Sequence, residues 1–180
     1  MARMTNAELL EYNKNRKVCQ ICIATRRNIE EVMDEWIDKL KVGPWTVLTM
    51  SDETVIEPKH DGKKIENKFK FYCALAMYGN IQIEIIQPVY GYFPAEDFLN
   101  RTGGGLQHFK EQFSTDAEMA ERIDELENMG IHKTFSGGLK EDRFCNFDTE
   151  AILGFALEYG NFANITLSED MSYTYPREEV

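Results

Sequence analysis

The sequence predicts an α+β fold in which two tandem βαβββ modules form one curled, cup-shaped mixed sheet with the helices outside. Two observations carry this prediction. Patterns typical of a strand, a helix and three further strands occur in this order twice along the chain. Laying Gln20 on His108 also brings Asn28 onto Asp116, and a helix with a capping pattern at its start follows directly in both modules.

The repeat divides the chain into five segments. We expect an N-terminal extension over residues 1–16, a first module over 17–89, a linker over 90–105, a second module over 106–160 and a C-terminal tail over 161–180. The extension carries a capping-box pattern, Thr5 to Glu8, that predicts a short peripheral helix. The acidic tail is expected to be a solvated terminus or an arm that contacts a second copy.

The first module begins with an alternating strand, followed by an amphipathic helix that ends at Gly43-Pro44. A charged loop separates the next two predicted strands, and the Gly79-Asn80 turn precedes the last. The four strands are expected over residues 17–25, 45–50, 69–78 and 81–89.

The second module repeats this order. Three consecutive glycines, Gly103 to Gly105, precede it and favour a tight turn between modules over a phosphate-binding loop, since no Lys-Ser/Thr pair follows them. Thr115 caps a helix that continues to Gly130, and an Asp148-Thr149 turn precedes the last strand. The four strands are expected over residues 106–113, 131–135, 143–147 and 152–159.

Composition restricts the class of partner. The 180 residues contain 20 Lys and Arg against 31 Asp and Glu, so the formal net charge is −11. This charge repels nucleic acid and anionic membrane surfaces. The polar start of the chain and the lack of a long apolar run predict a cytoplasmic protein. Four cysteines are then expected to be free thiols, and the Cys19/Cys22 pair to point to opposite faces of a strand instead of sharing a metal.

Four polar residues stand at matched places in the two modules. Gln20 and His108 lie in the first strand of each module, while Glu84 and Glu158 lie within the apolar last strand of each. Two modules related by a pseudo-two-fold axis would direct these side chains to one point in the cup. Each residue also has a simpler interpretation. A strand glutamate can form a salt bridge, His108 can be a core histidine, and Gln20 can hydrogen-bond across the axis.

From Val18 to Gly160 the chain resembles the vicinal oxygen chelate superfamily, in particular its methylmalonyl-CoA epimerase and glyoxalase-like branch. The resemblance rests on the segments KVGPW, YGNIQIEIIQP, FPAEDFLNRTGGGLQH and FDTEAILGFALEYG. It implies a divalent metal held by Gln20, Glu84, His108 and Glu158. Gln20 stands where the family has a histidine, so Mn, Co, Ni, Fe or Mg is expected over Zn.

Lys110, two residues after His108, is a second departure from the family pattern. It shares the strand face of His108, where a cation would compete with the metal for the carboxylates or hold an anionic substrate group or enolate. We therefore expect Glu158, Glu84 and Lys110 to be catalytic.

The expected activity is that of an isomerase, an epimerase or racemase. A metal-stabilised enolate forms when one carboxylate takes a proton next to a carbonyl, and the other carboxylate returns it. The small-molecule substrate is expected to be a thioester or a neutral aromatic ketone, and the protein can form a homodimer. The alternatives are a metal-free protein of the same fold that sequesters a small molecule, a glyoxalase-type lyase and, with less support, a ring-cleaving dioxygenase.

Overall fold

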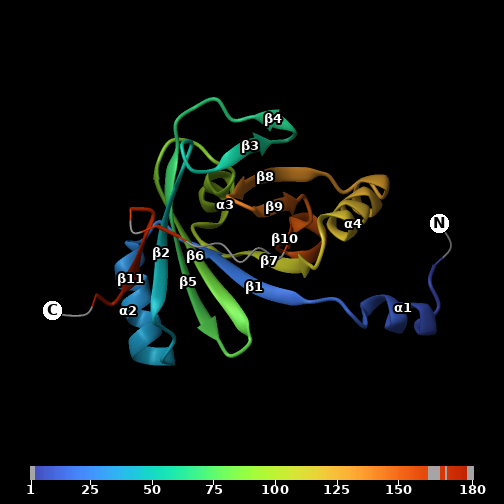
Figure 1. The fold of residues 1–180 in the computed structure, drawn as a ribbon, viewed down its shortest axis with the longest axis horizontal. Helices are drawn as coiled ribbons and strands as arrows, with labels where there is room; N and C mark the ends of the chain where they lie inside the picture. The colour runs from blue at the N-terminus through green and yellow to red at the C-terminus, as the bar shows by residue number, and fades with distance from the viewer. Residues whose placement is uncertain (1–2, 162–166, 169, 178–180) are drawn as a thin grey trace.

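The computed structural model describes residues 3–161, 167–168 and 170–177, which form one strongly curled sheet with helices outside it (Figure 1). The first half contains α1 (Asn6–Asn13), β1 (Val18–Ala24), α2 (Ile29–Leu40), β2 (Trp45–Ser51), β3 (Ile56–His60), β4 (Lys63–Lys64), β5 (Lys70–Tyr78) and β6 (Ile81–Tyr90). The second half contains α3 (Ala95–Thr102), β7 (Gly105–Phe113), α4 (Asp116–Asn128), β8 (Lys133–Leu139), β9 (Asp142–Phe147), α5 (Glu150–Leu153), β10 (Ala156–Asn161) and β11 (Ser172–Tyr175).

The strand order confirms the expected fold class. The sheet runs β11-β2-β5-β6-β1-β7-β10-β9-β8-β3-β4. At its centre β1 and β7 are antiparallel neighbours, and each pairs in parallel with the last strand of its own module, β6 or β10. The orders β2-β5-β6-β1 and β8-β9-β10-β7 are thus two copies of one arrangement, related by a pseudo-two-fold axis between β1 and β7.

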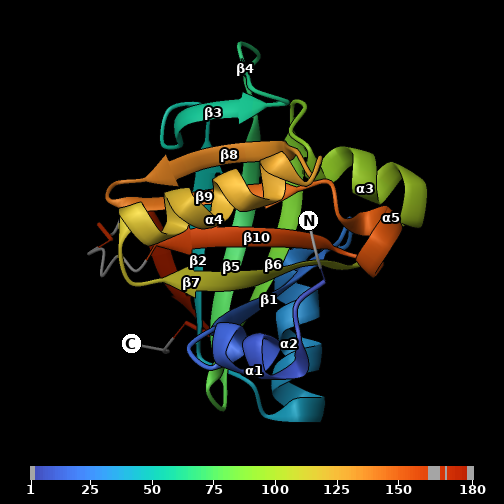
Figure 2. The ribbon, with the colours of Figure 1, turned by 90° about the vertical axis from the view of Figure 1, so that its right-hand side faces the viewer.

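Both long helices cover the outer face of the sheet (Figure 2). Asn28 caps α2 by accepting hydrogen bonds from the amides of Glu30 and Glu31, as its sequence position predicts. The apolar stripe of α2 packs on the outward residues of β5 and β6, and that of α4 packs on β7, β9 and β10. Because both helices lie outside, the concave face, called the cup below, stays open for a site.

The segment between β2 and β5 is not the plain charged loop expected from its composition. It contains the β3–β4 hairpin, and β3 lies beside β8 of the second module (Figure 1). In this pairing Lys59 is opposite Ser136 and His60 is opposite Phe135. We call residues 52–69 the strap. The strap runs from β2 of the first module to the far edge of the second, so it closes one end of the cup.

Three other expectations need correction. The 90–105 linker contains α3, and the expected strand over 152–159 starts only at Ala156, because Glu150–Leu153 forms α5. In the tail, β11 pairs with β2, so this part is neither a solvated terminus nor a free arm. The tail residues 162–166, 169 and 178–180 and the first two residues of the N-terminal extension lie outside the described residues.

The N-terminal extension forms the expected peripheral helix, with the Thr5 and Glu8 capping box in place. It is tied to the second module by Tyr12, which donates a 2.6 Å hydrogen bond to Glu125, and by Arg16, which pairs with the buried Glu111. No helix in the described part of the chain is long and apolar enough to cross a membrane.

Candidate active site

The register of the central strands brings the predicted site residues onto one face. Cys22 of β1 lies opposite Glu84 on β6 and opposite His108 on β7. One step along, Gln20 lies opposite Lys110 on β7. Because alternate strand residues share a face, all these side chains enter the cup. The strands of both modules are needed to assemble the cluster.

The two modules supply equivalent positions. Gln20 is opposite Lys110 and Cys22 is opposite His108, so the pseudo-two-fold axis exchanges Gln20 with His108 and Cys22 with Lys110. Glu84 lies beside Cys22, and Glu158 lies beside Lys110. The axis therefore also exchanges the two glutamates. Their surroundings differ, since one glutamate has a thiol neighbour where the other has an ammonium group.

Three oxygen atoms converge on the Nε2 atom of His108. Glu84 Oε2 lies at 3.2 Å, Glu158 Oε2 at 3.3 Å and Gln20 Oε1 at 3.3 Å from it. Gln20 donates its amide hydrogen to Gln82 over 2.7 Å, which turns the Gln20 oxygen toward the imidazole. The four residues named from the sequence are thus placed together, and His108, Gln20 and Glu158 are buried.

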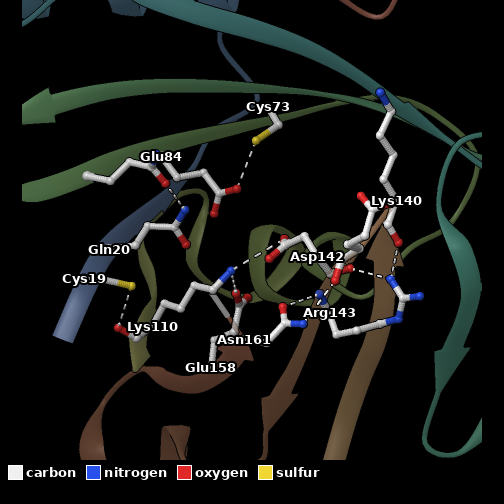
Figure 3. A network of polar contacts seen from close by, with 12 residues as sticks. Cys19, Gln20, Cys73, Glu84, Lys110, Lys140, Asp142, Arg143, Glu158 and Asn161 are labelled. Atoms are coloured by element: carbon white, nitrogen blue, oxygen red, sulfur yellow. Dashed lines mark hydrogen bonds and ion pairs between the residues drawn. The ribbon is translucent and has the colours of Figure 1, made fainter. Parts of the chain in front are cut away.

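The Lys110 side chain extends to Glu158 and Asp142 (Figure 3). Its Nζ atom lies 3.3 Å from Glu158 Oε1 and 3.9 Å from Asp142 Oδ2, and its side chain is 12% exposed. Asn146 donates a 2.9 Å hydrogen bond to Glu158 Oε2. Each Glu158 oxygen therefore has its own partners, and the carboxylate is held in one orientation.

Thiols surround Glu84. The Cys73 thiol donates to Glu84 Oε1 over 2.9 Å (Figure 3), and Cys22 lies opposite Glu84 on the adjacent strand. Burial raises the pKa of both thiols well above the ordinary value, so they remain neutral donors. The ligand-type atoms of Cys22, Glu84 and His108 lie within 4.8 Å of one another, a grouping that could hold a metal ion.

The charges of the cluster stabilise one another. Burial alone would raise the pKa of Glu84, but the hydrogen bond and charge of His108, together with the two thiols, lower it to about 2. Burial opposes the protonated forms of His108 and Lys110, yet the neighbouring carboxylates raise the pKa of both groups. Burial raises the pKa of Asp142. The cup therefore pairs its carboxylates with cation-forming groups in a site shielded from water.

The cluster forms one end of a cavity of about 980 Å³. The other end is apolar, with side chains from β2, β5, β8, β9 and the linker. His60, from the strap, also lines the cavity, and its Nδ1 atom lies 3.3 Å from the Tyr92 hydroxyl. Such a volume is typical of a site for a small organic ligand.

Sequence reasoning missed four polar groups that complete the site: Cys22, Cys73, Asp142 and Asn146. Cys22 could have been found, because it is two residues after Gln20 and so shares its strand face. The other three depend on the register of β5 and β9 against their neighbours, which no local pattern reveals. The structure confirms that all four cysteines are free thiols.

No family model matches the sequence, and no curated protein matches it significantly. Solved structures do match the fold. The hypothetical protein BH1468 from Bacillus halodurans C-125 is similar with a TM-score of 0.59 and 17% identity, over 86% of this chain and 99% of that one. Methylmalonyl-CoA epimerase from Mycobacterium tuberculosis is similar with a TM-score of 0.56 and 16% identity, over 81% and 87% of the two chains.

A third similar structure is a Streptomyces coelicolor methylmalonyl-CoA epimerase variant in complex with 2-nitronate-propionyl-CoA. It has a TM-score of 0.55 and 12% identity, over 84% of this chain and 98% of that one. At these identities the comparisons show the fold alone. The chain has the vicinal oxygen chelate fold, as its sequence resemblance implies.

Proposed function

We propose that this protein is an epimerase or racemase that removes a proton from a carbon next to a carbonyl group and returns it on the opposite face. The observation that carries the proposal is the placement of two carboxylates, Glu84 and Glu158, from opposite modules within 3.2–3.3 Å of one buried imidazole nitrogen. The fold that the chain shares with methylmalonyl-CoA epimerases supports the same class of reaction.

The two glutamates are suited to act as a pair of bases. One carboxylate takes the proton, and the electron pair of the C–H bond moves into the enolate. The other glutamate receives a proton from His108, which lies 3.2–3.3 Å from both carboxylates, and delivers it to the opposite face; the first glutamate then returns its proton to His108. The substrate is neither oxidised nor reduced, and only the configuration of one carbon changes.

Lys110 and His108 supply positive charge where the enolate oxygen develops. His108 is buried and the Lys110 side chain is only 12% exposed, and low exposure to water strengthens their electrostatic interaction with an anion. Lys110 contacts the Oε1 atom of Glu158, whereas His108 contacts Oε2. Lys110 can therefore stabilise an anion while His108 keeps its contacts with Glu158 and Gln20. We therefore assign Lys110 to stabilisation of the enolate and the glutamates to proton transfer.

The donor set fits a divalent metal ion. The oxygen atoms of Gln20, Glu84 and Glu158 lie within 3.3 Å of His108 Nε2, and these four residues would hold the ion in place of the proton on His108. A bound ion of this kind supplies Lewis-acid polarisation of a carbonyl oxygen. Oxygen-rich donors favour Mn, Co, Ni, Fe or Mg over Zn.

A metal-free protein that binds and sequesters a small molecule is the second candidate. The 3.3 Å contact between Lys110 and Glu158 favours it, because an ammonium group already balances one carboxylate of the set. Metal analysis of the purified protein separates the two. A stoichiometric ion supports the enzyme, whereas no ion and no gain of activity with Mn, Co or Ni supports the binding protein.

The decisive experiment follows exchange of the α-proton by NMR in deuterated water, with Mn or Co and a panel of α-chiral thioesters and ketones. We expect exchange with both enantiomers in the native protein and its loss from one enantiomer in Glu158→Gln. Glu111→Gln is the matched control, since Glu111 is a buried strand glutamate that pairs with Arg16 outside the cup. Unchanged exchange in Glu158→Gln would show that the assignment of this residue is wrong.

A further inference from the structure

The cavity has two chemically different ends. The polar end holds the glutamates, His108 and Lys110, described above. Side chains from both modules and the linker line the apolar end, namely Leu48, Met50, Phe71, Phe93, Phe135 and Phe144. A ligand that fills the cavity must therefore be polar at one end and apolar at the other.

The phenylalanines of the apolar end form a continuous set of rings. Phe71 and Phe93 stack with centroids 4.4 Å apart and planes 13° apart. Phe135 is tilted against Phe93 at 6.5 Å and against Phe144 at 5.5 Å. Phe71, Phe93 and Phe135 are buried and packed in one core cluster with strap residues, so their positions are fixed before a ligand enters. Fixed ring faces and edges favour a planar aromatic group over a flexible chain.

The charge of the cavity argues against a polyanionic substrate. Among the described residues that line it, six are Asp or Glu and two are Lys or Arg. One of the two cations, Arg101, is paired with Glu150, and Lys110 is held by Glu158 and Asp142. The described part of the lining therefore provides no unpaired cluster of basic groups for the phosphates of a coenzyme A tail, and its net charge repels them.

We propose that the substrate is an uncharged aryl ketone whose reactive C–H lies between the carbonyl group and an aromatic ring. The carbonyl lies at the polar end, and the ring lies among Phe93, Phe135 and Phe144. This inference rests on the proposed function. Of the two substrate classes expected from the sequence, it favours the aromatic ketone over the thioester. A ring attached to the reacting carbon also makes its proton more acidic, which suits a carboxylate base.

Binding and exchange of deoxybenzoin, an uncharged ketone with a CH₂ between a carbonyl and a phenyl ring, test the inference. We expect calorimetry to show that deoxybenzoin binds at least about fivefold more tightly than its dicyclohexyl analogue. Phe144→Leu and Phe135→Leu should each weaken binding about fivefold or more. Phe155→Leu is the matched control, because Phe155 is a partly buried ring that stacks on Phe109 at 4.3 Å and does not line the cavity. Circular dichroism checks that each variant folds.

The outcomes separate the inference from the proposed function. If deoxybenzoin binds with this pattern but its CH₂ protons do not exchange, the aromatic site stands and the proton-transfer proposal is wrong. If an aliphatic ketone or a coenzyme A thioester exchanges while deoxybenzoin does not bind, the reaction stands and the aromatic inference is overturned. Equal losses of deoxybenzoin affinity in Phe144→Leu and Phe155→Leu would also overturn the aromatic inference.

Discussion

Gly160 leaves the space that the side chain of Lys110 occupies. A Cβ atom built at position 160 would lie 2.3 Å from Cε and 2.9 Å from Nζ of Lys110. Lys110 is thereby able to lie flat across β10 and to reach both Glu158 and Asp142. The glycine thus determines where the buried ammonium group lies.

Gly160→Ala should reduce catalysis by displacing Lys110. We expect a roughly ten- to hundredfold fall in α-proton exchange, the scale of one lost charge-assisted contact. Lys110→Met should cause a similar loss, and the double variant should add little to it, because both changes remove the same contact. NMR exchange rates measure the effect. Additive losses in the double variant would contradict the coupling.

Glu84→Gln and Glu158→Gln should each stop exchange from one enantiomer and spare exchange from the other. The reason is that each glutamate is proposed to serve one face of the enolate. The measurement uses the two enantiomers of an α-chiral substrate separately in deuterated water. If either variant loses exchange equally from both enantiomers, the glutamates are not a two-base pair.

Gln20→His should raise the affinity for Co and Ni by about tenfold, because imidazole is a better ligand than an amide oxygen for these ions. Competition with a chromophoric chelator measures the affinity. His60→Gln is a suitable control, since His60 lines the cavity away from the converging donors. Equal affinities in the native protein and Gln20→His would show that position 20 is not a ligand.

The four thiols should react slowly in the folded protein. Burial raises the pKa of Cys145 to about 12 and raises the pKa of the other three cysteines as well, so little thiolate forms at pH 8. A disulfide reagent should release its chromophore slowly from native protein and rapidly in guanidinium. Rapid reaction of more than one thiol in native protein would contradict the described burial.

Arg16→Ala should destabilise the fold by roughly 3 kcal/mol, because it leaves the buried Glu111 carboxylate without its partner. Chemical denaturation measures the loss. Adding Glu111→Gln should restore part of the stability, since the uncompensated charge is removed. No recovery in the double variant would show that packing of the arginine side chain, and not its charge, stabilises this junction.

The sequence predicted most of the regular elements and failed where a pattern is short or polar. Capping residues at Asn28 and Thr115 marked both long helices, and the structure contains both caps. The β3–β4 hairpin was missed because its residues are mostly charged and its partner, β8, lies far along the chain. Helix α3 was missed because its first residue follows Pro94, which supplies no side-chain cap.

By itself the sequence determined the repeated module and the matched residues Gln20, His108, Glu84 and Glu158, because period and spacing are local properties. Only the tertiary structure decided what surrounds them. Cys73, Asn146 and Asp142 join the site through strand register, which sets neighbours between residues that are distant in sequence. The aromatic end of the cavity likewise exists only where strands of both modules, the linker and the strap pack together. The physical reason is that sheet curvature and pairing, not local pattern, determine which side chains share one enclosed space.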